Sequence, residues 1–303
     1  MTALGERAIP PVFQFPTGFQ QRLGTSPEDA FFSGTYLAGG YKIGFLRIGT
    51  FQPVSTGAAL SQLTAEVQYL SQNTDGLVLD VTRNDGGDAT YQDQVAQLFF
   101  PAPFNTLAEQ ARPTLDAILS AANFLSAAQQ TNPPNQALIG NLQQVYNQLN
   151  SAYTDGQRLT GPLLLHNAFQ TLSPATDQSG NTIAYSKPML LLVDENTACG
   201  AEAFAAVFQD NQRGLTVGKT TQGAGGAIEP GPGGFFSEAQ LGITRTLFVR
   251  GSGSNTSYIQ NAGVTPDVFL EYMTVANLTG NGQPFVNAFT SLIVNELSAQ
   301  SPH

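Results

Sequence analysis

The sequence has little charge, a single cysteine and only two histidines. Lys, Arg, Asp and Glu make up 11% of the 303 residues, against about a quarter in typical soluble proteins. One cysteine, Cys199, excludes a disulfide within the chain and a zinc site built from cysteines. His166 and His303 are too few for a histidine cluster, and no spacing of acidic residues and histidines resembles a metal motif. We therefore expect chemistry that needs neither a metal nor a cofactor.

Long apolar runs and basic clusters are also missing. No run approaches the ~20 residues that span a bilayer, and the N-terminal "MTALGERAIPPVF" lacks a basic segment followed by an apolar one. Neither a membrane span nor a signal peptide is therefore visible in this chain. A net charge of -10 and a pI of about 4.5 disfavour nucleic acid as a partner. The low charge, with Gln, Asn, Thr, Ser and Gly at the polar positions, favours an extracytoplasmic location, periplasmic or secreted.

The chain does contain enough apolar residues, 41%, for a sizeable core. Residues 1–30 are rich in Pro, Gly and Gln, and we interpret them as an N-terminal arm before a core of residues 31–303. Order is expected to start with a strand at 41–51. A helix at 57–72, a buried strand that begins at 76 and a helix at 91–100 follow. This alternation predicts an α/β fold with a largely parallel sheet.

Residues 106–160 have a different pattern, with two or three helices, a break at "TNPPN" and no strand signal. We interpret them as a helical insertion that is either plain scaffold or a lid or packing arm. The sheet pattern resumes in "KPMLLLVDE" and "RGLTVGKTT", with a helix that begins at Cys199 between them. A strand at 239–250 and a final helix near 285–297 complete the prediction.

Cys199 stands at a turn from a strand to a helix. Such a turn holds a side chain at the carboxyl edge of a parallel sheet, where α/β proteins bind ligands. The N-terminus of the following helix favours negative charge, which predicts a stabilised thiolate or a stabilised oxyanion beside it. A lone cysteine is also often a small buried hydrophobic residue, so the pattern by itself leaves both interpretations open.

Two glycine-rich segments are further candidates. In "RNDGG", residues 83–87, the glycines after a buried strand allow backbone N–H groups to approach a ligand, which suits an oxyanion hole. A tight turn that binds no ligand is equally compatible with this sequence. The segment "GAGG", residues 223–226, lacks the Lys-Ser/Thr of a phosphate-binding loop and precedes no clear helix, so we interpret it as a loop.

Four segments occur in an order that resembles the tail-specific, or C-terminal processing, serine peptidases. They are "GFLRIGTF", "GLVLDVTRNDGG", "KPMLLLVDENTACGAEAFAAVFQDNQRGLTVGKTTQGAGG" and "YIQNAGVTPDVFLEY". The resemblance covers residues 41–297 apart from the helical insertion. It implies a tricorn-like, crotonase-like ββα superhelical core that hydrolyses peptide bonds through an acyl-enzyme.

The resemblance also assigns roles to individual residues. It places Cys199 at the position of the nucleophilic serine, either as a natural or as an engineered replacement. It implies that Gly86, Gly87 and the N–H group of Gly200 bind the oxyanion. Asp210, eleven residues after Cys199, matches an aspartate that is expected to support the helix and the following loop rather than take part in chemistry.

The residues that act as or assist the general base in this family are absent from the matching positions of this sequence. The lysine of one branch corresponds to Ala224, and the glutamate of the histidine branch corresponds to Gln260. His166, the only internal histidine, is expected to be a packing or surface residue. A histidine from an upstream segment is the first candidate base.

Three functions therefore remain open. The first is a peptidase acting on a polypeptide, at its C-terminal portion. The second is an inactive peptide-binding or scaffolding homologue, and the third is acyl-CoA chemistry on the related crotonase fold. The sequence leaves the oligomeric state open.

Overall fold

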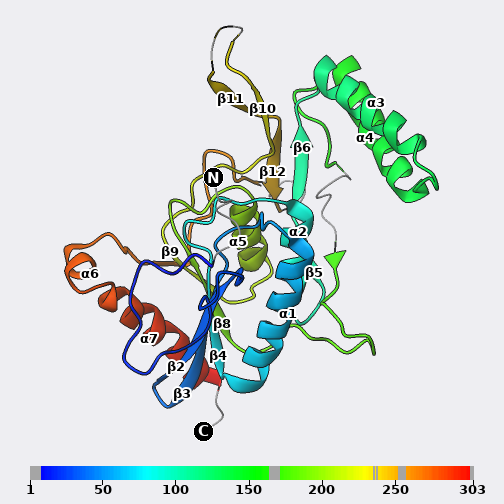
Figure 1. The fold of residues 1–303 in the computed structure, drawn as a ribbon. Helices are drawn as coiled ribbons and strands as arrows, with labels where there is room; N and C mark the ends of the chain where they lie inside the picture. Colours follow the sequence, from blue (N-terminus) through cyan, green and yellow to red (C-terminus); the bar gives the residue numbers. More distant parts are fainter. Residues whose placement is uncertain (1–7, 164–170, 235, 237, 252–256, 301–303) are drawn as a thin grey trace. The chain divides into compact units, whose positions relative to one another are not determined.

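The computed structural model describes residues 8–163, 171–234, 236, 238–251 and 257–300. The chain divides into two compact units (Figure 1). Unit 1 comprises residues 1–104, 172–224 and 262–303, and unit 2 comprises residues 105–171 and 225–261. Among the described residues, no helix combines the length and the apolar character needed to cross a membrane.

Unit 1 is built on a seven-stranded sheet in the order β1-β2-β3-β4-β8-β9-β14. The pairs β1·β2 and β2·β3 are antiparallel, whereas every later pair is parallel. The α/β class with a largely parallel sheet is thus confirmed. The strands are β1 (Gln20–Leu23), β2 (Phe32–Ala38), β3 (Tyr41–Arg47), β4 (Gly76–Asp80), β8 (Met189–Val193), β9 (Leu215–Gly218) and β14 (Val268–Phe269).

Helices cover both faces of this sheet, which explains why its central strands read as unbroken apolar runs (Figure 1). On one face, the last helix buries a stripe of apolar residues at a spacing of four against the strands, namely Phe285, Phe289, Ile293 and Leu297. Helix α1 buries Leu63, Val67 and Leu70. The helices of unit 1 are α1 (Thr56–Asn73), α2 (Ala89–Gln97), α5 (Gly200–Asp210), α6 (Val275–Thr279) and α7 (Gln283–Gln300).

The first ordered segments begin earlier than the sequence pattern indicated. Strands β1 and β2 precede the expected first strand, and β1 pairs with β2. The ring of Phe13 is buried and lies 5.9 Å from that of Phe45, centroid to centroid, while Phe15 stacks on Phe19 at 3.9 Å. Residues from Ala8 onward therefore contribute aromatic side chains to the core, a role that the high Pro and Gly content of this segment concealed.

Unit 2 combines a helical hairpin with short strands. The hairpin consists of α3 (Leu115–Gln129) and α4 (Gln136–Thr154), as expected, capped by Thr114 and Asn135 (Figure 1). A three-stranded antiparallel sheet has the order β13-β12-β6, and β10 pairs with β11. The strands are β6 (Ala108–Ala111), β10 (Ile228–Pro232), β11 (Gln240–Thr244), β12 (Thr246–Arg250) and β13 (Ser257–Tyr258). In the sequence, the short strands β5 (Phe104–Asn105) and β7 (Thr171–Leu172), which pair with each other, mark the boundary between the units.

Two details of the sequence prediction were wrong in unit 2. Residues 106–160 include a strand, β6, whose sequence "AEQA" carries no β-propensity and which forms because it pairs with β12, more than 130 positions away. The expected single strand at 239–250 is two strands, β11 and β12, which belong to different sheets and are separated at Arg245.

Candidate active site

Cys199 lies in a strained turn between β8 and α5. Its φ of 50° and ψ of -117° place it in a region that few residues other than glycine adopt. Hydrogen bonds on both sides hold this geometry. The N–H group of Ala198 donates to the carbonyl of Asn84 at 2.8 Å, and that of Ala203 donates to the carbonyl of Cys199 at 3.0 Å. The turn therefore fixes the thiol at the N-terminus of α5.

The glycine turn after β4 lies directly against this cysteine. A Cβ atom on Gly86 would come within 2.6 Å of the nitrogen of Gly200 and 2.8 Å of the Cβ of Cys199. Gly86 and Gly87 also have φ values of 97° and 144°, which side chains disfavour. Glycine is therefore required at position 86 both for its backbone conformation and for the close approach to Cys199.

Two backbone donors converge on the sulfur. The N–H groups of Gly87 and Gly200 lie beside the thiol of Cys199 and act to lower its pKa. The N–H group of Gly86 instead donates to Oδ1 of Asn84 at 2.9 Å, and the side chain of Asn84 donates to the carbonyl of Ile48 at 3.0 Å. Of the three expected glycine donors, the N–H group of Gly86 thus already has a partner in this structure, whereas those of Gly87 and Gly200 lie beside the thiol.

The pKa of the Cys199 thiol is raised above its ordinary value. Burial is the main cause, and the negative charges of Glu202 and Asp85 add to it. The N–H groups of Gly200 and Gly87 act in the opposite direction but do not outweigh burial. The prediction that the helix N-terminus would favour a thiolate was therefore wrong for the free thiol, because the balance of these effects favours its protonated form.

Glu202 is a buried residue that the sequence analysis did not single out. Its carboxylate accepts hydrogen bonds from four donors, which tie the N-terminus of α5 to the following loop. They are the N–H groups of Cys199 (3.1 Å), Gly223 (2.6 Å) and Ala224 (2.7 Å) and the hydroxyl of Thr221 (2.5 Å). Only its place three residues after the turn, typical of a capping box, could have indicated this role.

The other predicted site residues lie in different surroundings. Asp210 ends α5 and is exposed, and the eleven-residue helix places it about 16 Å from Cys199. Ala224 lies in the loop held by Glu202, and Gln260 belongs to unit 2, where it is half-buried. His166 falls outside the described residues. Among the described residues, no three side chains gather that could hold a metal ion.

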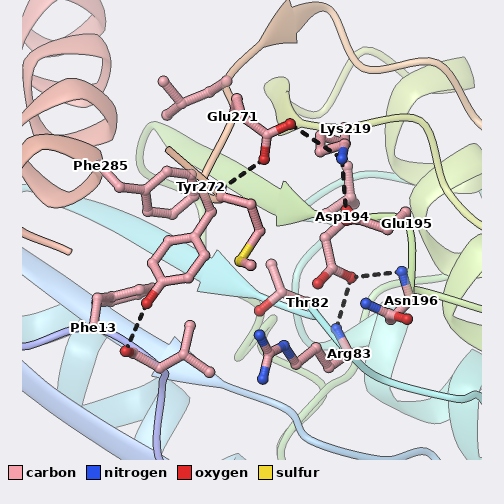
Figure 2. A pocket seen from close by; sticks show the side chains of 14 residues that line it. Phe13, Thr82, Arg83, Asp194, Glu195, Asn196, Lys219, Glu271, Tyr272 and Phe285 are labelled. Carbon is pink, nitrogen blue, oxygen red and sulfur yellow. Dashed lines mark hydrogen bonds and ion pairs between the residues drawn. The ribbon is translucent and has the colours of Figure 1, made fainter. Parts of the chain in front are cut away.

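A separate small cavity lies at the carboxyl ends of β4, β8, β9 and β14 (Figure 2). Its volume of about 40 Å³ leaves room for little more than water. Lys219 bridges Glu195 at 3.0 Å and Glu271 at 3.1 Å, and Asp194 accepts the N–H group of Arg83 at 2.8 Å. Cys199 does not line this cavity. Its ion pairs link the residues that follow β8, β9 and β14.

Comparison with known proteins places this geometry in a family. The model of "Peptidase family S41" matches residues 42–270. A protein of Chlamydia trachomatis serovar D is 27% identical over 261 residues, which cover 77% of this chain and 41% of that protein. A chloroplastic C-terminal processing peptidase of Tetradesmus obliquus is 24% identical over 233 residues, covering 76% of this chain and 35% of the peptidase. The chain thus spans about two fifths of the length of these curated relatives.

Solved structures share the fold. The crystal structure of mature CPAF matches with a TM-score of 0.73 at 21% identity, over 100% of this chain and 61% of CPAF. Mature CPAF complexed with lactacystin matches with a TM-score of 0.71 at 21% identity, over 96% of this chain and 58% of CPAF. These likenesses show a common architecture, and the match to the family model covers most of the chain. The chain belongs to peptidase family S41.

Proposed function

We propose that this chain is the catalytic core of a peptidase that hydrolyses peptide bonds through an acyl-enzyme on Cys199. The observation that carries the proposal is the close packing of the Gly86–Gly87 turn against Cys199 and Gly200, which brings the N–H groups of Gly87 and Gly200 beside the thiol. A carbonyl carbon attacked by that sulfur brings its oxygen beside the same two donors, which then stabilise the developing negative charge. Membership of a peptidase family supports this reading of the geometry.

The chemical steps balance without a cofactor. The thiolate of Cys199 adds to the carbonyl carbon of the substrate, and the tetrahedral intermediate collapses with loss of the amine, which takes up a proton. Water then attacks the thioester, releases the carboxylic acid product and restores the thiol. In this scheme Asp210 supports α5 and takes no part in the chemistry.

The proton of Cys199 needs an acceptor because burial raises the pKa of the thiol. Glu202 already accepts hydrogen bonds from four donors, and Ala224 and Gln260 carry no group that takes up a proton at neutral pH. His166 lies outside the described residues, and our first candidate for the base is a histidine in a segment upstream of this chain. The longer curated relatives have room for such a segment.

The substrate in this proposal is an extended polypeptide, bound by its C-terminal portion, outside the cytoplasm. Similarity to a C-terminal processing peptidase supports the choice of substrate end. The low charge of the sequence supports the location. Assembly into an oligomer is compatible with the proposal but is not part of it.

A second candidate function is peptide binding without cleavage. The raised pKa of Cys199 favours it, as do the alanine and glutamine at positions 224 and 260. In that case the S41 fold would hold a polypeptide across the same turn, and no acyl-enzyme would form.

Acylation by an activated peptide ester separates the two candidates. An activated ester loses its leaving group without a proton donor, so it tests the nucleophile and the oxyanion donors apart from the missing base. We expect mass spectrometry to detect one acyl group on the wild-type chain and none on Cys199→Ala. Because the chain has no other cysteine, iodoacetamide labelling at graded pH reports on the same sulfur. Labelling without any acylation, together with retained peptide binding, would establish the binding function instead.

A further inference from the structure

Unit 2 contains an apolar groove between the helical hairpin and the strands β6, β11 and β12. Its volume is about 370 Å³, within the range of roughly 300 to 1,000 Å³ that ligand pockets occupy. Buried side chains of α4, Leu142, Val145 and Leu149, form its floor. On α3, small residues such as Ala117 and Ala121 face the groove and keep it open. We refer to this feature as the unit 2 groove.

Two large apolar side chains form the walls of the unit 2 groove and are exposed to solvent. Phe124 of α3 is 65% exposed and Ile243 of β11 is 48% exposed. Their apolar surface faces a concave space, where a ligand would remove it from water. Leu119 of the same helix is 63% exposed but does not line the groove, so it provides a matched control.

The rim of the groove carries a solvent-exposed cation, Arg112. Arg245 forms an ion pair with Asp116 at 2.8 Å, and Glu109 is buried and hydrogen-bonds to Thr246. Within the described residues, the guanidinium of Arg112 has no hydrogen bond or ion pair. A carboxylate on the ligand would complement Arg112.

The groove also offers a strand edge. In the described part of the chain, β11 pairs with β10 alone, and Ile243 and Thr244 of β11 line the groove. A strand edge supplies hydrogen bonds to an extended peptide backbone, which an acyl chain lacks. This edge favours a polypeptide over a fatty acid as the occupant.

We propose that the unit 2 groove docks an apolar segment of a polypeptide, with a carboxylate next to the apolar side chains paired to Arg112. The choice of a polypeptide rests in part on the proposed function, whereas the apolar and acidic character of the ligand rests on the groove alone. The site recognises substrate without taking part in the reaction at Cys199.

Binding is measured on the full chain carrying Cys199→Ala, so that cleavage plays no part. The probe is a fluorescein-labelled peptide with three consecutive leucines followed by an aspartate, read out by fluorescence anisotropy. Comparison peptides replace the aspartate with asparagine or the leucines with serines, and decanoate serves as the fatty-acid competitor. The variants are Phe124→Ser, Arg112→Gln and, as the control, Leu119→Ser.

We expect Phe124→Ser to weaken binding of the leucine-aspartate peptide about ten-fold, and Leu119→Ser to leave it unchanged. Arg112→Gln should reduce the affinity to that of the asparagine peptide and leave the affinity for the asparagine peptide itself unchanged. Equal binding by all variants, no binding by any of them, or displacement of the peptide by decanoate at lower concentration than by unlabelled peptide would overturn the proposal. Acylation of Cys199 is scored separately, so a groove that binds peptide in a chain that never acylates would contradict only the proposed function.

Discussion

The surroundings of Cys199 and the unit 2 groove differ in how far their polar groups have partners and their apolar side chains are covered. Around Cys199, the neighbouring backbone donors have partners, and Gly86 approaches Gly200 so closely that no side chain fits. In the groove, large apolar side chains face solvent and the guanidinium of Arg112 has no partner among the described residues. The difference teaches that the turn at Cys199 needs no further partner to hold its geometry, whereas the unit 2 groove leaves apolar surface and a cation that a ligand would cover if the proposed docking is right.

Around Cys199, the largest effect is expected from a methyl group at the closest approach. Gly86→Ala places a Cβ against the nitrogen of Gly200 in a residue with φ of 97°. We expect it to lower the free energy of unfolding by about 3 kcal/mol, measured by urea denaturation. Gly140→Ala is the matched control, because that glycine lies inside α4 with open space around it and a normal φ. The control should raise stability by about 0.5–1 kcal/mol. Equal effects of the two changes would contradict the preformed packing.

Replacing Glu202 tests whether the hydrogen bonds that its carboxylate accepts near Cys199 contribute to the stability of the protein. Glu202→Gln puts an amide group among four donors, so it leaves at least one of them unpaired. We expect a loss of about 2–3 kcal/mol in unfolding free energy. The pKa of Cys199 should fall at the same time, because the charge of Glu202 helps to raise it. An alkylation pH profile measures that pKa, and an unchanged profile would show that Glu202 does not act on the thiol.

Asp93 on α2 is a carboxyl group whose surroundings disfavour its charged form. Burial, together with the charge of Asp88, raises its pKa to about 7. The folded state thus holds this proton after the unfolded state has lost it, so stability should fall as pH rises from about 4 to 7. Asp93→Asn removes that dependence and should stabilise the protein by about 1–2 kcal/mol at pH 8, with no gain at pH 4. Thermal unfolding at both pH values checks the sign, and a uniform shift at both would disprove the assignment.

The smallest effect is expected in the groove. Phe124→Ser should change the unfolding free energy by no more than about 0.5 kcal/mol, because the ring is mostly exposed. Leu149→Ala in the floor should cost about 2–5 kcal/mol, because that side chain is buried. A large loss for Phe124→Ser in urea denaturation would mean that the ring already serves the core of unit 2, and the contrast between the two regions would weaken.

Residue patterns predicted the parallel part of unit 1 because its strands and helices are long and periodic. They also placed Cys199, Gly86 and Gly87 in turns, and the structure brings these residues together. The patterns failed where distant pairing decides the structure, as for β6, whose local sequence favours a helix.

The properties of the site were harder to predict. Whether the pKa of Cys199 is raised or lowered depends on how deeply the thiol is buried, which the sequence does not show. In the structure, the effect of burial outweighs that of the Gly87 and Gly200 N–H groups. The role of Asn84, which occupies the N–H group of Gly86, depends on side-chain geometry within the turn. Both properties depend on the packing of the Gly86–Gly87 turn against the start of α5, which is a tertiary contact.

The central claim is that backbone donors stabilise an oxyanion at Cys199, and deleting one donor tests it most directly. Gly200→Pro removes the N–H group at the first position of α5, where proline is compatible with a helix, and Gly200→Ala keeps it. Two rates are compared at equal thiolate fraction: acylation by an activated peptide ester, which forms an oxyanion, and alkylation by iodoacetamide, which does not. We predict that Gly200→Pro slows acylation about 100-fold or more and changes alkylation less than about three-fold, with Gly200→Ala close to wild type. Equal slowing of both reactions, or of neither, would contradict the account.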